Sequence, residues 1–115
     1  MAPKFSLQSV LDVRHGKVEL LEIDLGKLLT AQQETEMRLS NLRDFQTNLF
    51  EQLNQEQSGE IDLFKINMLR TNIQRAKTLI ETVTLELEKR KQAVEAKRNE
   101  LVKARQAEET LEILV

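Results

Sequence analysis

His15 is the only histidine in the 115-residue chain, and histidine is the residue type most often used for acid–base catalysis near neutral pH. It stands between Arg14 and Gly16, and the chain contains no cysteine. A histidine needs an orienting partner group to act as a general base or a metal ligand. Because the sequence shows no acidic cluster beside it, we expect an exposed, inert His15. A functional His15 is the less favoured alternative.

Two pairs of carboxylates are the other residues whose types suggest chemistry. Glu34 with Glu36, and Glu86 with Glu88, are each two residues apart, so on a helix they point to different faces. The three glycines are isolated, and none forms a phosphate-binding loop between a strand and a helix. We therefore predict no enzymatic activity, no cofactor and no metal site.

The composition indicates which elements position these residues. The chain has four Phe, no Tyr or Trp, three Gly and one Pro, with 31% charged and 40% hydrophobic residues. Such a composition is typical of long helices and coiled coils. The net charge of −2 argues against nucleic-acid binding, which requires an excess of Lys and Arg. No apolar run approaches the roughly 20 residues that cross a bilayer, so we predict a soluble cytoplasmic protein without membrane insertion.

A heptad pattern runs along nearly the whole chain. Alternating steps of four and three residues give two series of positions, here called the seam. In the first series ten of fourteen residues are apolar: Leu7, Leu11, Arg14, Val18, Leu21, Leu25, Leu28, Gln32, Thr35, Leu39, Leu42, Gln46, Leu49 and Leu53. In the second, twelve of fifteen are apolar: Ile66, Leu69, Ile73, Ala76, Ile80, Val83, Leu87, Arg90, Val94, Lys97, Leu101, Ala104, Glu108, Leu111 and Val115. A sustained period of 3.5 residues predicts a coiled coil.

One polar stretch, residues 54–60, interrupts the pattern and contains Ser58 and Gly59, which favour turns. The sequence therefore predicts an all-α fold, a long two-helix antiparallel coiled-coil hairpin in a single domain covering residues 1–115. We expect helix 1 at about 7–55, the turn at about 56–60 and helix 2 at about 60–115. Folding at residue 57 or 58 places Leu21 opposite Val94, and Leu42 opposite Ile73. A monomeric hairpin buries its own seam, although a dimer would give the same pattern.

Two surfaces are candidates for binding other proteins. Residues 89–105 hold seven basic residues against two glutamates, which suits an acidic partner. A solvated face with ion pairs such as Glu100–Lys103 is the favoured alternative. Near the turn, Phe50, Ile61 and Phe64 are expected to close the end of the hairpin, whereas Phe45 and Met68 lie off the seam.

The chain opens with Phe5-Ser6-Leu7-Gln8-Ser9-Val10-Leu11-Asp12-Val13-Arg14. This Phe-x-Leu-x-x-(Val/Leu)-Leu-x-x-Arg pattern, followed by two long helices and one short turn, resembles the FliJ family. These are small proteins of the flagellar type III export apparatus, with relatives in virulence secretion systems. The resemblance covers the whole chain, but only the first ten or so residues are distinctive. Family members usually continue the second helix beyond the point corresponding to Val115, so we expect a truncated chain or a short variant.

The resemblance implies a stalk-like coiled coil that enters the pore of a hexameric export ATPase and promotes its assembly. It also implies links to the transmembrane export gate and to export chaperones, and attachment at the inner membrane through the export apparatus. A structural or adaptor coiled coil of another assembly, such as a rotary-ATPase stalk-like subunit, is the alternative. For the positions that match the motif, capping of the open end of the hairpin is at least as favoured as direct contact with a partner. The residues considered for partner contact are Phe5, Leu7, Val10, Leu11, Arg14, Phe45, Met68, Lys89, Arg90, Lys91, Lys97 and Arg98.

Overall fold

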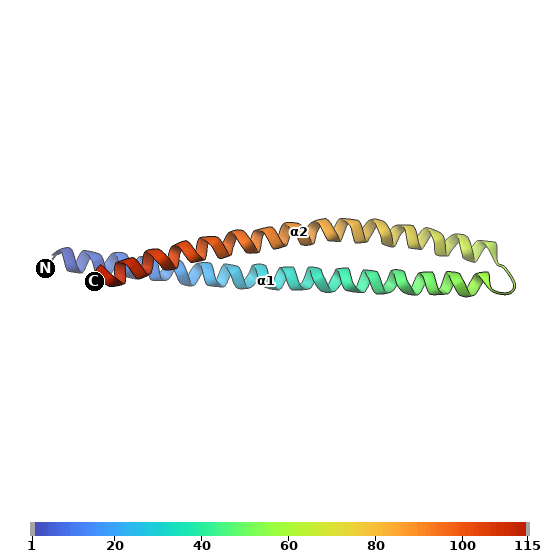
Figure 1. The fold of residues 1–115 in the computed structure, drawn as a ribbon, viewed down its shortest axis with the longest axis horizontal. Helices are drawn as coiled ribbons and strands as arrows, with labels where there is room; N and C mark the ends of the chain where they lie inside the picture. Colours follow the sequence, from blue (N-terminus) through green and yellow to red (C-terminus); the bar gives the residue numbers. More distant parts are fainter. Residues whose placement is uncertain (1, 115) are drawn as a thin grey trace. The chain divides into compact units, whose positions relative to one another are not determined.

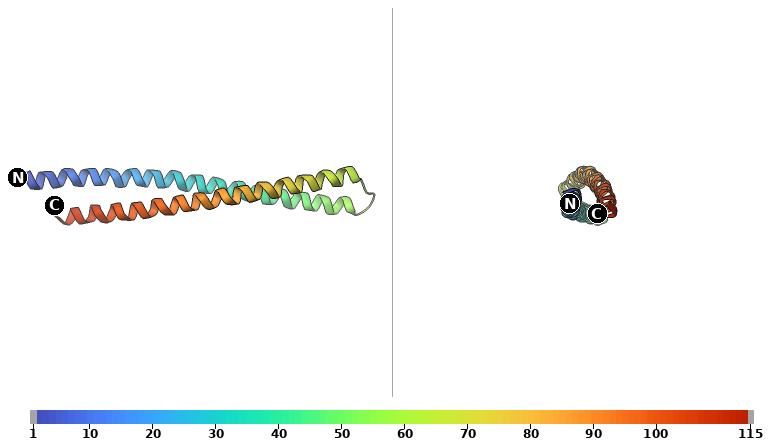
Figure 2. Two further views of the ribbon diagram at one scale, coloured as in Figure 1. Left: turned by 90° about the horizontal axis from the view of Figure 1, so that it is seen from above. Right: turned by 90° about the vertical axis from the view of Figure 1, so that its left-hand side faces the viewer.

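The computed structural model describes residues 2–114, with side chains from residue 6 onward. Helix α1 spans Ala2–Gln57 and helix α2 spans Leu63–Leu114, and the described residues contain no strand. The contacts divide the chain into two units. Unit 1 combines Met1–Ala31 with Arg90–Val115, and unit 2 is Gln32–Lys89. Within each unit a segment of α1 lies antiparallel to a segment of α2 (Figures 1 and 2), which confirms the predicted antiparallel helical hairpin.

The helix bounds differ from the expected ones at two ends. Helix α1 begins at Ala2 rather than at about residue 7. Pro3 does not prevent this early start, because the first turn of a helix needs no amide donors from its residues. Helix α2 begins at Leu63 rather than at about residue 60, because Asp62 caps it. The backbone N–H of Lys65 donates to Oδ1 of Asp62 at 3.3 Å, as in an N-cap.

The turn consequently occupies residues 58–62. Ser58 ends α1 by donating from both its backbone N–H and its hydroxyl to the carbonyl oxygen of Gln55, at 3.3 and 3.0 Å. Gly59 follows with φ 121°, a conformation that residues with a Cβ rarely adopt. The Ser-Gly signal in the sequence thus marks the start of the turn, and Asp62 marks its end.

The predicted seam is the buried side of both helices. Among the described side chains at the predicted positions, Arg14 alone is exposed, and the others are buried or half-buried. In unit 2, Leu39, Val83 and Leu87 form one buried cluster, and Leu49, Leu69 and Ala76 form another. In unit 1 the buried cluster consists of Val18, Leu21 and Leu101. Hydrophobic burial along the 3.5-residue pattern therefore holds each pair of helical segments together.

The pairing between the helices is displaced by one heptad from the expected one. In unit 1, Leu21 packs with Leu101 rather than with Val94. In unit 2, Leu42 and Ile80 pack against the same cluster, whereas Leu42 was expected to face Ile73. The expected register was wrong because the turn lies later in the chain than the assumed fold point. A shift of a full heptad preserves the seam, so the apolar pattern alone does not distinguish the two registers.

Candidate protein-interaction surfaces

His15 bridges the two helices of unit 1. One ring nitrogen, Nδ1, lies 2.5 Å from Oε1 of Glu108 on α2, and Nε2 lies 3.0 Å from Oε1 of Glu19 on α1. The hydrogen bond and the negative charge of Glu108, followed by the charge of Glu19, raise the pKa of His15 above 6.5. His15 is exposed, as expected, but the acidic neighbours that were not expected from the sequence are present. Glu19 is visible in the sequence four residues away, whereas Glu108 becomes a neighbour only through the helix pairing.

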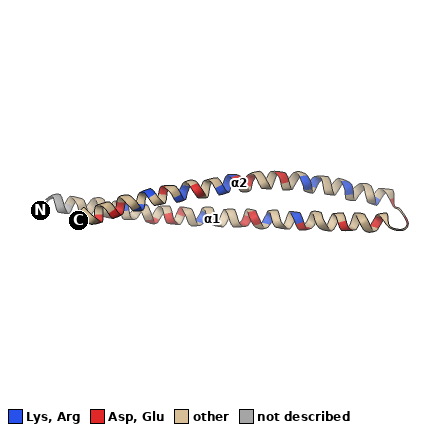
Figure 3. Cartoon of the chain, in the orientation of Figure 1, with Lys and Arg blue, Asp and Glu red and all other residues tan. Residues whose placement is uncertain are grey.

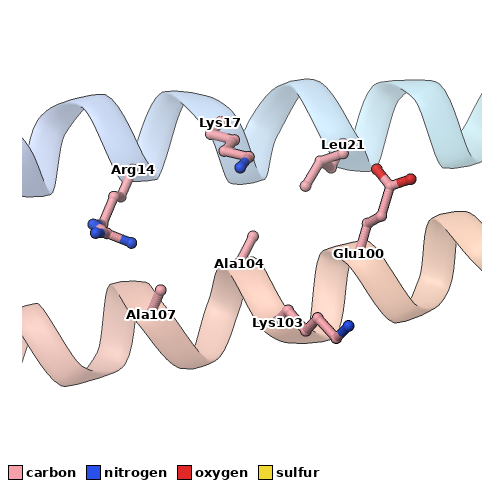
Figure 4. A pocket seen from close by; sticks show the side chains of 7 residues that line it. All are labelled: Arg14, Lys17, Leu21, Glu100, Lys103, Ala104 and Ala107. Carbon is pink, nitrogen blue, oxygen red and sulfur yellow. The ribbon is translucent and has the colours of Figure 1, made fainter.

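A hollow lies between the helices of unit 1 next to this bridge. Figure 4 shows Arg14 and Lys17 on α1 facing the small side chains of Ala104 and Ala107 on α2. Here it is called the Arg14 hollow; its volume is about 360 Å³ and it is lined by Arg14, Lys17, Leu21, Glu100, Lys103, Ala104 and Ala107. Alanines at and beside the seam leave space that larger apolar residues fill elsewhere. Arg14 was among the residues considered for partner contact from the sequence, and Lys103 was part of the basic stretch, whereas Lys17 was missed.

Acidic residues interrupt the predicted basic stretch (Figure 3), and its members belong to both units. Lys89 lies in unit 2, and Arg90, Lys91, Lys97 and Arg98 lie in unit 1. Lys91 and Arg98 are exposed, whereas Arg90 and Lys97 are half-buried. Figure 3 shows acidic residues interspersed among the basic ones along α2.

Ion pairs neutralise several of these charges. Lys97 pairs with Glu100 at 3.2 Å, which corrects the expected Glu100–Lys103 pair. Arg105 pairs across the helices with Glu22 at 2.9 Å. In unit 2, Arg38 pairs with Glu86 at 3.3 Å and Lys65 with Glu56 at 2.8 Å. The pairs of Lys97 and Arg105 agree with the favoured interpretation of the basic stretch as a solvated, salt-bridged face.

Unit 2 exposes apolar side chains close to the turn. Phe45 and Met68, expected off the seam, are 52% and 51% exposed. Phe50, Ile61 and Phe64 were expected to close the end of the hairpin, and this was wrong, since they are 48%, 58% and 73% exposed. The seam at this end is filled instead by four aliphatic residues, Leu49, Leu53, Ile66 and Leu69.

Part of this exposed surface is ordered along one face of α2. Phe64, Met68, Arg75 and Leu79 recur at helical spacing, and shallow hollows lie beside them. Exposed apolar side chains gathered in this way are typical of protein-binding surfaces. We refer to Phe64, Met68 and Leu79 as the α2 stripe.

Residues 3–115 match the family described as FliJ, Flagellar FliJ protein. The chain belongs to the FliJ family. Comparison with curated proteins and with solved structures found no match. Membership confirms the resemblance inferred from the N-terminal motif and makes the chain a coiled-coil protein related to flagellar export. The FliJ family is a structural and regulatory family without enzymatic activity.

The FliJ-like motif residues differ in their surroundings. The side chain of Phe5 lies outside the described part of the structure. Leu7 and Leu11 are half-buried, as seam residues should be, and Val10 is 43% exposed. Arg14 lines the Arg14 hollow. Of the motif positions described, Val10 and Arg14 are therefore the two whose side chains are accessible to a partner.

Among the described residues, no group of three or more His, Cys, Asp or Glu suits a metal ion. Neither α1 nor α2 contains a stretch apolar and long enough to span a bilayer in that part of the chain.

Proposed function

We propose that this FliJ-family chain is a non-enzymatic, stalk-like regulator of a hexameric flagellar export ATPase and an escort for export chaperones. The observation that carries the proposal is the family match over residues 3–115. The paired helices of both units support it, because a self-paired coiled coil presents a firm surface to a surrounding ring. On this proposal the chain acts in the cytoplasm as a monomeric hairpin, and reaches the inner membrane through its contacts with the export apparatus.

The proposed mechanism is a shift in the oligomer equilibrium of the ATPase. A partner changes an equilibrium only through its different affinities for the two states. A chain that binds the closed ring more tightly than the free subunit raises the proportion of hexamer. The effect saturates when all rings are occupied, and it requires no chemistry from the chain itself.

The test is the hexamer population of the purified export ATPase from the same organism, measured by analytical ultracentrifugation with and without excess chain. The proposal predicts a larger hexamer fraction and co-sedimentation of the chain with the hexamer. A matched variant, Leu39→Lys with Val83→Lys, places two charges in a buried cluster of unit 2 and should lose the effect together with its helicity. An unchanged distribution without co-sedimentation would contradict the proposal and leave an adaptor coiled coil of another assembly.

The escort role is tested separately, by binding of purified export chaperones to the chain. The α2 stripe is the surface whose exposure best suits such a partner. Met68→Ser should weaken chaperone binding, while Leu85→Ser, another exposed apolar residue of α2, should leave it unchanged. Equal binding by both variants would contradict the role of the stripe.

A further inference from the structure

The Arg14 hollow collects positive charge that unit 1 does not neutralise. Elsewhere in this unit, Arg105 and Lys97 pair with Glu22 and Glu100. By contrast, none of the described carboxylates forms an ion pair with Arg14, Lys17 or Lys103. Glu100 is the one carboxylate that lines the hollow, and its Oε2 already accepts from Lys97. The three cations therefore line a space in which the one carboxylate, Glu100, is already paired with Lys97.

The unpaired positive charge of Arg14 follows from its position at the seam between the two helices. The seam side of α1 mostly faces large apolar residues of α2, but here it meets the small side chains of Ala104 and Ala107 (Figure 4). Their methyl groups are too short to fill the layer, and Arg14 stays exposed instead of packing. A side chain from another molecule can enter this space and contact both the apolar floor and the guanidinium group.

We propose that the Arg14 hollow binds a carboxylate side chain, Asp or Glu, from an acidic segment of a protein partner. The planar guanidinium group of Arg14 can donate two parallel hydrogen bonds to a carboxylate, and the ammonium groups of Lys17 and Lys103 add charge at the sides. Leu21 and the two alanines suit the methylene groups of the entering side chain. This proposal rests on the proposed function, because it names the chemistry by which unit 1 recognises a protein partner.

Charge on the whole molecule favours a carboxylate over a phosphate polymer or a lipid surface. The chain has a net charge of −2, so it does not attract polyanions over a distance. Glu100 also lines the hollow, and its negative charge disfavours a dianionic phosphate more than a single carboxylate. A local cationic hollow in an acidic protein thus suits one acidic side chain on a larger protein surface.

The test is an NMR titration of the full ¹⁵N-labelled chain with a terminally blocked synthetic peptide of alternating Glu and Ala. The same peptide with Gln in place of Glu, and inorganic phosphate, are titrated in parallel. The proposal predicts that the Glu peptide shifts the amide signals around residues 14, 17 and 103, weakly but saturably, and that the Gln peptide does not. Adding salt should weaken the binding.

Two double variants distinguish binding in the hollow from a general effect of positive charge on the chain. Arg14→Gln with Lys103→Gln removes two cations of the hollow and should weaken binding of the Glu peptide about tenfold, the loss expected for one charge-assisted contact. Lys27→Gln with Lys77→Gln removes two exposed cations outside the hollow and should change the affinity less than about twofold. Circular dichroism checks that both variants remain helical.

Three results would overturn the proposal: no saturable shift with the Glu peptide, equal binding of the Glu and Gln peptides, or equal losses in the two double variants. Phosphate binding as tightly as the Glu peptide would show a general anion site and overturn the choice of a carboxylate. The titration contains no export ATPase. Its failure alongside a normal shift in hexamer population would therefore remove the hollow from the account and leave the proposed function standing.

Discussion

Arg14 and His15 are neighbours in sequence but have opposite electrostatic surroundings. Both ring nitrogens of His15 face carboxylates, one on each helix of unit 1. The guanidinium group of Arg14 faces a hollow that Lys17 and Lys103 also line. His15 therefore joins the two helices of unit 1, whereas Arg14, the residue before it, offers its charge to another molecule. An arginine at a seam position is costly for packing, and partner binding gives it a role that packing does not.

The His15 bridge makes the pairing of unit 1 dependent on pH. Its pKa is raised in the folded chain, so protonated His15 is favoured by folding. The stabilisation is complete below the ordinary pKa of about 6.5 and is lost as the pH rises through the raised value. We expect the melting temperature of the wild type to fall, relative to that of His15→Gln, as the pH rises from about 6 to about 9.

The comparison uses thermal unfolding followed by circular dichroism across that pH range. Gln keeps a polar side chain at position 15 but cannot be protonated. Glu19→Gln with Glu108→Gln, which removes both partners, should abolish the same pH dependence. If the difference in melting temperature between the wild type and His15→Gln were constant with pH, the bridge would have no part in stability.

At the scale of the helices, Gly26 and Gly59 have opposite consequences for stability. Gly26 lies inside α1, and a Cβ there would meet nothing within 4 Å. Gly26→Ala should therefore stabilise the chain by about 1 kcal/mol, through helix propensity alone. Gly59 lies in the turn with φ 121°, and Gly59→Ala should destabilise it by about 1–3 kcal/mol. Urea unfolding of both variants measures the difference, and changes of the same sign would contradict the assigned turn.

The register of unit 1 is testable because the chain has no native cysteine. Leu21→Cys with Leu101→Cys places thiols on two residues of one buried cluster, and should form an intramolecular disulfide on mild oxidation. Leu21→Cys with Val94→Cys tests the register displaced by one heptad and should remain reduced. Mass spectrometry and gel mobility without reductant distinguish the two. Preferential oxidation of the second pair would show that the helices pair in the other register.

The heptad pattern contained enough information to predict the helices, the seam and the antiparallel fold. Burial follows the predicted positions because the apolar spacing determines which side of each helix leaves water. The register was not predictable in the same way, since a shift of seven residues leaves every apolar contact apolar. It depended on where the turn lies, and the capping role of Asp62 was the signal that the sequence analysis missed.

The candidate surfaces were predicted less well than the fold. The exposure of Phe45 and Met68 followed from their positions off the seam, whereas Phe50 and Phe64 were expected to be buried because they lie near the turn. Large aromatic side chains are usually buried, yet in a two-helix unit only seam positions offer burial. The Arg14 hollow and the Glu108–His15 contact depend on residues about ninety positions apart, so they required the pairing itself.

At the scale of the whole molecule, the chain consists of two long helices and belongs to a family without enzymatic activity. Membership of the FliJ family gives the cellular process, flagellar export. Exposed ion pairs occur in both units, and the net charge of the chain is −2. The central claim is that the chain regulates an export ATPase. This regulation concerns the ATP hydrolysis rate of the ATPase as well as its assembly into hexamers.

The most direct test is the ATP hydrolysis rate of the same organism's purified export ATPase, measured while the chain is added up to a stoichiometric excess. The account predicts a saturable increase that the Leu39→Lys and Val83→Lys double variant does not produce, because that variant cannot maintain the paired helices. A rate that stays unchanged at every ratio of chain to ATPase, with folded wild-type chain, would contradict the account.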